Sequence, residues 1–180
     1  MPNKETANYT VLRTWEEENV EMRQYPAQKW VSIQNAGKSI DQVSTSSFFK
    51  LFDYIQGKNV AKEKIPMTKP VCFTSSQDGE DARKRIITSS FYLPVAQQDN
   101  PPQPKNSEVF IEARPALKVY SRSYDGFSND KTLIEQARLL SASLDKLGLH
   151  YQNDPYYFAG YNSPFKLTDR HNEVWFQAID

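Results

Sequence analysis

Side chains that commonly carry catalysis or bind metals are scarce in this chain. Its 180 residues include two histidines, His150 and His171, and one cysteine, Cys72. No His-x-x-x-His or Cys-x-x-Cys pair occurs, and no glycine-rich phosphate loop follows an expected strand. Metal centres and phosphate loops need such spacings, because several ligands or backbone amides must converge on one ion or phosphate. The sequence therefore offers little standard catalytic equipment.

Each of these three side chains has a structural interpretation that we favour over a reactive one. Cys72 has apolar neighbours on both sides, which is typical of a buried, inert thiol. His150 follows the helix-ending Gly148, where an imidazole faces the carbonyl end of a helix. His171 lies in the charged turn 168–172, where we expect a solvated surface position.

Glu173 leaves two interpretations open. At the start of an expected strand, it is either a carboxylate in a pocket or one partner of a salt bridge at a sheet edge. Together with Tyr161 it supplies the candidate pair for an enzyme that acts on a small hydrophobic molecule. Of three hypotheses for the function of this chain, the enzymatic one is the weakest.

The elements that must position these side chains are built from an internal repeat. Residues 20–41, VEMRQYPAQKWVSIQNAGKSID, align without a gap with residues 109–130, VFIEARPALKVYSRSYDGFSND, 89 positions further on. Pro26 coincides with Pro115, and Gly37 coincides with Gly126. Each copy predicts a strand that bends at proline, a second strand, a turn at glycine and a helix. Two copies indicate one domain of two similar halves around an approximate two-fold axis.

A long helix is predicted after each copy of the repeat. The first spans 39–55, with a cap at Ser39 or Asp41 and a stop at Gly57. Its apolar side chains recur at spacings of three and four and form one broad face, with Phe49 on the flank: Ile40, Val43, Phe48, Leu51, Phe52 and Ile55. The second helix spans 130–147 and carries a regular leucine stripe.

Two helices and roughly eight strands, without alternating β-α-β crossovers, predict an α+β fold. We expect a distorted antiparallel β-barrel of two pseudo-symmetric halves, each with one long helix packed on the sheet. The chain then forms a single domain over 1–180, with halves at about 9–95 and 107–178 joined by the proline-rich link 94–106. Residues 74–84 are expected to form a polar, flexible connection.

Bulk composition excludes several classes of function. The 22 basic and 22 acidic side chains cancel, so the chain has no electrostatic bias towards nucleic acid. No apolar run reaches the roughly 20 residues of a membrane span, and the N-terminus has no apolar signal region. A single cysteine fits a reducing compartment, so we expect a cytoplasmic protein.

Seven segments, in order along the chain, resemble the SOUL heme-binding protein (HEBP) family, most closely its SOUL-type vertebrate members. They are VEMRQYPAQKWVS, FDYIQGKN, KIPMTKPV, SFYLPVAQQDNPPQPKNSEVFIE, VYSRSYDGFS, YYFAGYNSP and NEVWF. The resemblance implies the gyrase-inhibitor-like fold of two halves, which the repeat indicates independently. It also implies binding of heme or other tetrapyrroles, without catalysis, as a carrier or buffer.

The same resemblance implies where a tetrapyrrole lies. In this family the ligand is placed against the first helix, near the loop before the last strand. Carried over here, these positions are Thr45, Phe48, Phe49, Phe52, Phe165 and Lys166. SOUL-type members have a histidine iron ligand in the fourth position of a Glu-x-Arg-x-Tyr motif, and this chain has Gln24 there. Heme is thus expected without the SOUL-type axial histidine, and Gln24→His is expected to raise affinity and shift the ferric spectrum towards low spin.

A second hypothesis makes the chain a protein-interaction module. SOUL-type members are linked to mitochondrial cell-death pathways through a BH3-like stretch in the second helix. Here Leu140, Leu144 and Asp145 keep part of that spacing and would face a Bcl-2-type partner, with association at the mitochondrion and a role in apoptosis. The same leucines suit a helix that faces its own core. Exposure of the two leucines distinguishes these interpretations.

Overall fold

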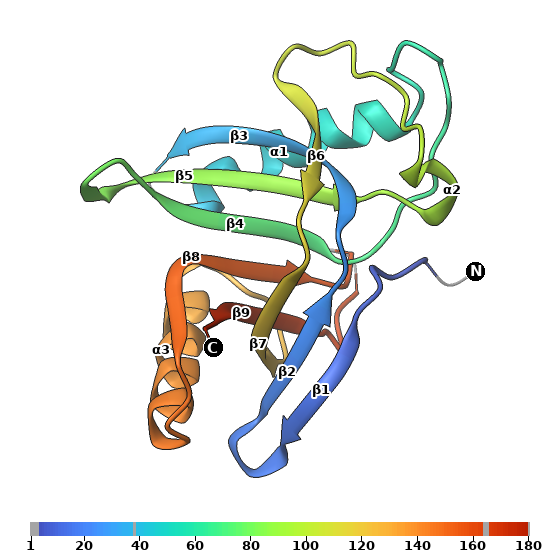
Figure 1. The fold of residues 1–180 in the computed structure, drawn as a ribbon. Coiled ribbons are helices and arrows are strands. Elements are labelled where there is room, and N and C mark those ends of the chain that lie inside the picture. The colour runs from blue at the N-terminus through green and yellow to red at the C-terminus, as the bar shows by residue number, and fades with distance from the viewer. Residues whose placement is uncertain (1–3, 38, 164–165, 180) are drawn as a thin grey trace.

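The computed structural model describes residues 4–37, 39–163 and 166–179. Within these ranges the chain forms nine strands, two long helices and two short helical turns (Figure 1). The strands are β1 Thr10–Trp15, β2 Val20–Tyr25, β3 Gln28–Gly37, β4 Val71–Asp78, β5 Asp81–Tyr92, β6 Val109–Arg114, β7 Leu117–Tyr124, β8 Tyr151–Gly160 and β9 Asn172–Ala178. The helical elements are η1 Glu16–Glu18, α1 Ile40–Ile55, α2 Val95–Gln98 and α3 Asp130–Lys146.

The nine strands form one antiparallel sheet in the order β1-β2-β7-β9-β8-β4-β5-β3-β6. If β1 is left out, this order is symmetric about the pair of β8 and β4. Each strand on one side of that pair then has its repeat equivalent at the same distance on the other side. β2 of the first copy pairs with β7 of the second, and β6 of the second copy pairs with β3 of the first. These exchanged pairings tie both copies of the repeat into one sheet.

The first turns of α1 and α3 meet on the pseudo-two-fold axis. The backbone N–H of Asp130 donates to the Asp41 carboxylate at 2.9 Å, and the N–H of Asp41 donates to the Asp130 carboxylate at 3.1 Å. The two residues are 89 positions apart, which is the offset of the repeat. A carboxylate at a helix N-terminus is favourable, because it accepts from otherwise unpaired N–H groups. The contact therefore stabilises both helix starts and joins the two copies.

Both long helices begin and end where the sequence predicts, to within one residue. The Ser39 hydroxyl accepts from the N–H of Gln42 at 3.3 Å, and Asn129 forms a reciprocal capping box with Thr132. Gly148, just after α3, takes a φ of +70°, a conformation that suits glycine at a helix end. In the described part of the chain, no helix is both long and apolar enough to cross a membrane.

The buried side chains form three clusters. The α3 core lies under α3 and includes Leu140 and Leu144, and the α1 core lies under α1 and includes Leu51. The third, here called the central aromatic cluster, contains no residue of either helix. Its members come from seven strands and the N-terminal segment: Ala7, Tyr25, Trp30, Cys72, Tyr92, Val119, Tyr157, Ala159 and Trp175. Neighbouring residues on one strand, such as Val174 and Trp175, belong to different clusters, and successive side chains of a strand point to opposite faces. The helices therefore cover one face of the sheet, while aromatic rings from both halves pack together on the other.

The predicted α+β class is confirmed, but the expected flexible connection at 74–84 is wrong. β4 continues to Asp78 and β5 begins at Asp81, so most of this segment is a hairpin, with Thr74 opposite Thr88. Ser75 is buried, at 1% exposure, although it is polar. The apolar side chains come from the partner strand, where Ile87 lies opposite Ser75, so 74–84 itself lacks the usual alternation of apolar and polar residues.

Candidate functional site

The aromatic surface expected on α1 is partly open to solvent. Phe49 is 61% exposed, whereas Phe48 and Phe52 are half-buried. The rings of Phe48 and Phe52 stack with centroids 5.8 Å apart, and Phe48 also meets the edge of Phe91 in β5 at 5.3 Å. Thr45 is exposed, one helical turn before Phe49. The structure thus brings these predicted site residues together, with Phe48 and Phe52 anchored on the α1 core.

The buried side of α1 is more polar than the predicted apolar face. Ser47 and Tyr54 are buried together with Leu51 and Ile55. Ser47 accepts a hydrogen bond from the amide of Asn35 at 2.8 Å, and the Tyr54 hydroxyl donates to the carbonyl of Pro102 at 2.6 Å. Hydrogen bonding makes burial of these polar groups tolerable. The helix can therefore leave Phe49 at the surface.

Two further predicted site residues, Lys166 and Gln24, belong to other elements than α1. Lys166 is exposed, and its carbonyl accepts from Arg170 at 2.8 Å. Phe165 falls outside the described residues. Gln24 is half-buried in β2, where its amide donates to the carbonyl of Tyr25 at 3.3 Å. Since β2 pairs with β1 and β7 while α1 packs mainly on β3 and β5, Gln24 and the α1 aromatic surface belong to separate elements.

A buried polar network, here called the Glu173 cluster, is the most highly connected polar feature of the described residues. Glu173 lies on β9 with 2% exposure and accepts five hydrogen bonds. Arg23 of β2 donates two of them, at 2.7 and 2.9 Å, in a bidentate ion pair. The other donors are Tyr161 at 3.0 Å, Trp175 at 2.9 Å and His171 at 2.7 Å. The cluster comprises Arg23, Tyr25, Tyr161, His171, Glu173 and Trp175.

The environment of Glu173 keeps its carboxylate ionised. Burial by itself raises the pKa of Glu173, but hydrogen bonds from His171, Arg23 and Trp175 and the charge of Arg23 outweigh it and lower the pKa from 4.5 to about 2. Burial and the negative charge of Glu173 raise the pKa of Tyr161, so its hydroxyl stays protonated and donates. Both groups are thus locked in one protonation state around neutral pH.

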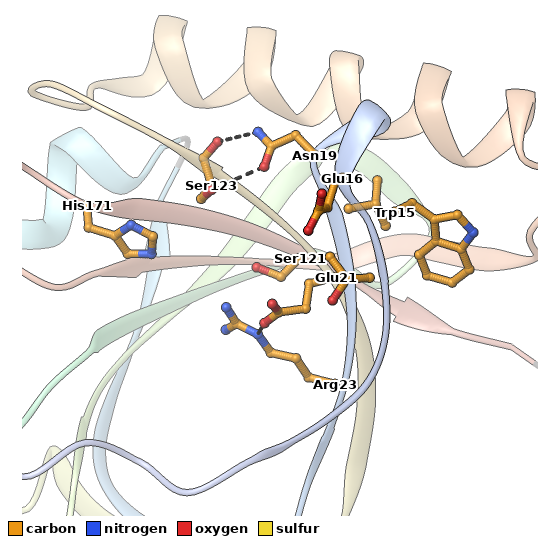
Figure 2. A pocket seen from close by; sticks show the side chains of 10 residues that line it. Trp15, Glu16, Asn19, Glu21, Arg23, Ser121, Ser123 and His171 are labelled. Atoms are coloured by element: carbon orange, nitrogen blue, oxygen red, sulfur yellow. Dashed lines mark hydrogen bonds and ion pairs between the residues drawn. The ribbon is translucent and has the colours of Figure 1, made fainter.

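A polar pocket of about 320 Å³ lies beside the Glu173 cluster (Figure 2). Arg23 and His171 line it from the cluster, and the carboxylates of Glu16 and Glu21 line it from the β1–β2 hairpin. The Asn19 amide donates to the carbonyl of Ser123 at 2.8 Å, joining the hairpin to β7 at the rim. Its walls combine hydroxyl, amide and charged groups with the apolar side chains of Trp15 and Val20, so the pocket suits water or a small molecule of mixed polarity.

The Glu173 cluster favours a structural role over proton transfer. Glu173 already accepts five hydrogen bonds, and the hydroxyl of Tyr161 is committed to it. A general base needs a free lone pair and a pKa near the working pH, and Glu173 has neither. Glu173 and Tyr161, the candidate pair for an enzyme, are therefore in contact. Their hydrogen bonds, however, are those of a buried network in which each group already has its partners.

Sequence reasoning singled out three members of this cluster, Tyr161, His171 and Glu173, and left the setting of Glu173 open between a pocket and a sheet edge. Glu173 is not at a sheet edge, because β9 lies between β7 and β8. His171 is exposed at the surface, as expected, but its ring also bonds to Glu173. Arg23 was missed as a partner, although its two-residue spacing from Tyr25 puts both on one face of β2. Cys72 is fully buried, as expected.

The leucines of the proposed interaction helix are core residues. Leu140 and Leu144 are both 0% exposed and pack in the α3 core against strands of the sheet. Asp145 is exposed and accepts a hydrogen bond from the Tyr151 hydroxyl at 2.9 Å. In this fold the two leucines face the sheet, so a partner reaches them only if α3 leaves it.

Comparison with known proteins gives one consistent family. A family model described as SOUL heme-binding protein matches residues 4–177. Human Heme-binding protein 2 is 43% identical over 155 residues, which cover 86% of this chain and 76% of that protein. Mouse Heme-binding protein 1 is 31% identical over 173 residues, which cover 95% of this chain and 91% of that protein.

Solved structures with the same architecture are more distant in sequence. The C-terminal domain of EcmrR has a TM-score of 0.61 at 14% identity and covers 89% of this chain and 97% of its own. A hydrolase from Listeria innocua has a TM-score of 0.60 at 10% identity and covers 99% of this chain and 94% of its own. At such identities the likeness shows the fold alone.

Proposed function

Because this chain belongs to the SOUL heme-binding protein family, we propose that it binds heme or another tetrapyrrole on the aromatic surface of α1. The surface comprises Thr45, Phe48, Phe49 and Phe52. In this role the protein is a non-enzymatic carrier or buffer in the cytoplasm. The observation that carries the proposal is the exposure of Phe49, 61%, beside the stacked rings of Phe48 and Phe52.

The described residues fit the face of a tetrapyrrole better than its iron. Flat aromatic rings suit a porphyrin face, and exposed Lys166 offers a cation for a propionate, with Phe165 as a further proposed contact. Iron in heme proteins is held by histidine, cysteine, methionine or tyrosine, and the amide of Gln24 is none of these. When bound, heme would supply its iron for ligand or electron exchange. The residues of α1 would hold only its apolar face.

Energetics limits how tight such binding can be. Burying about 300 Å² of porphyrin gives roughly 7 kcal/mol at about 25 cal/mol per Å². Association costs on the order of 4–15 kcal/mol, so apolar contact alone is marginal. A propionate pair with Lys166 would add a modest amount, because the lysine is exposed. Weak, reversible binding is what a buffer or carrier requires.

Phe49→Asp should weaken hemin binding about tenfold or more, because it puts a charge on the most exposed ring of the apolar surface. The test is a hemin titration followed at the Soret band. Ile134→Asp is the matched control, since Ile134 is 63% exposed on the equivalent helix α3. Phe48 is a poor choice for the test because it packs on Phe91, so its loss would also destabilise the fold. Equal affinities for wild type and Phe49→Asp would overturn the proposal.

The position of Gln24 changes the result expected for Gln24→His. Because Gln24 lies in β2 and α1 packs mainly on β3 and β5, a histidine there should leave the ferric hemin spectrum unchanged. The measurement is the Soret and visible spectrum of the ferric complex of each protein. A shift towards low spin would instead place the iron beside β2 and count against the α1 surface.

The alternative is a Bcl-2-type partner contacting Leu140, Leu144 and Asp145. Such an interaction would require α3 to detach and expose two fully buried leucines. Detachment would uncover the α3 core, which costs free energy in proportion to the apolar area exposed. We therefore rank tetrapyrrole binding first.

A further inference from the structure

A second pocket, of about 420 Å³, lies beside the β2–β3 turn. The β2–β3 turn, the start of β3, α2, the end of β6 and the N-terminal segment form its walls. It shares no residue with the α1 aromatic surface or with the polar pocket beside Glu173. Whatever binds here is therefore independent of the tetrapyrrole proposal.

Arg114 gives this pocket a largely buried guanidinium, not all of whose N–H groups donate to the protein. Its side chain is 10% exposed. The guanidinium donates to Glu112 at 3.1 Å, to the Ser90 hydroxyl at 3.0 Å and weakly to the Cys72 sulfur at 3.6 Å. An arginine has five N–H groups, so two have no acceptor among the described residues. Arg114 lines the pocket, so these two N–H groups are available to donate to an oxygen ligand there.

Trp30 adds a second unmatched donor in the same stack. The Arg114 guanidinium lies over the Trp30 ring, 4.3 Å from its centroid, and Tyr92 meets that ring edge-on at 5.5 Å. Trp30 is 1% exposed, and its indole N–H has no acceptor among the described residues. Trp30 itself does not line the pocket, so its ring supports the Arg114 guanidinium from behind rather than contacting a ligand.

The rest of the pocket supplies one more cation and an apolar wall. Lys29 lines it, and its ammonium has no ion-pair partner in the described ranges. Pro26, Tyr92 and Val95 form apolar walls, and Asp99 is the carboxylate at the pocket. We propose that this pocket binds a small organic carboxylate with an apolar body. The carboxylate would lie towards Arg114 and Lys29, and the body against the apolar walls.

Benzoate is a suitable probe, and NMR titration of the full chain is a suitable measurement. We expect saturable shifts of the backbone amides of Lys29 and Arg114 and of the Trp30 indole N–H. The dissociation constant should be on the order of 1 mM, as for other small fragments. Benzamide has the same shape without the charge, so it should bind at least tenfold more weakly.

Two charge variants test the proposal without removing a buried group. Lys29→Gln should weaken benzoate binding about threefold, and Asp99→Asn should tighten it about twofold, with both effects smaller in high salt. Arg114→Gln should abolish binding, and its thermal unfolding must be measured beside it because Arg114 is buried. Benzoate shifts that do not saturate, equal binding of benzamide, or an unchanged affinity in both Lys29→Gln and Asp99→Asn would each overturn the proposal. Loss of binding in Arg114→Gln with both charge effects as stated would support it.

Discussion

Arg23→Met is expected to lower the free energy of unfolding by about 3–5 kcal/mol. The substitution leaves the carboxylate of Glu173 buried at 2% exposure without its bidentate partner. Taking a charge out of water is costly, and in the native protein Arg23 compensates for that cost. Chemical denaturation followed by tryptophan fluorescence measures the loss.

Arg13→Met is the matched control, because Arg13 lies on neighbouring β1, is exposed and stacks on Trp15 at 4.6 Å. It should change stability by less than about 1 kcal/mol. The double variant Arg23→Met with Glu173→Met should be more stable than Arg23→Met alone, since it removes the stranded charge. A loss for Arg23→Met no larger than for Arg13→Met would show that the ion pair is not what holds β2 to β9.

The same pair makes stability depend on pH in a definite direction. The pKa of Glu173 in the folded protein is about 2, well below its ordinary 4.5. The ionised group therefore stabilises the fold above about pH 4.5, and this contribution is lost as the pH falls from 4.5 towards 2. The shift corresponds to a contribution on the order of 3 kcal/mol. Because glutamine does not titrate, acidification from pH 4.5 towards 2 should lower the free energy of unfolding of Glu173→Gln correspondingly less than that of wild type.

Leu144→Ala is expected to cost about 2–5 kcal/mol, because the leucine is fully buried in the α3 core and its removal leaves a cavity. Ile134→Ala on the same helix is the control. Ile134 is 63% exposed, so its truncation should cost less than about 0.5 kcal/mol. Thermal or denaturant unfolding of the two variants gives the comparison.

This pair of variants also distinguishes the two hypotheses for α3. A core role predicts a much larger loss of stability for Leu144→Ala than for Ile134→Ala. If Leu144→Ala unfolded at the same denaturant concentration as wild type, the leucine would not contribute to the native core. A detachable helix that presents Leu140 and Leu144 to a partner would then become the better interpretation.

The repeat and the two helices could be predicted because they depend on local sequence. A proline that bends a strand, a glycine with a positive φ and an N-cap beside an apolar stripe act within a few residues. The hairpin at 74–84 escaped this reasoning. Its buried Ser75 carries no apolar signal, and only the partner strand shows that the segment is extended.

The exposure of the α1 aromatic surface was predicted only in part. Spacing of three and four residues identified the apolar face, but it could not decide which rings face the core and which face solvent. That depends on how the helix is rotated on β3 and β5, and the structure buries Ser47 and Tyr54 while it exposes Phe49. Helix rotation is set by packing against distant strands, which local spacing does not contain.

By itself, the sequence determined that the chain contains an internal repeat and has an α+β fold, where the long helices begin and end, and which family the chain resembles. Tertiary structure alone decided that Arg23 and Glu173, 150 positions apart, form a buried ion pair. It also separated Gln24 from the α1 surface and placed Arg114 over Trp30. The physical reason is the same in each case. Local sequence sets backbone conformation, whereas burial and charge pairing depend on which strands become neighbours in the sheet.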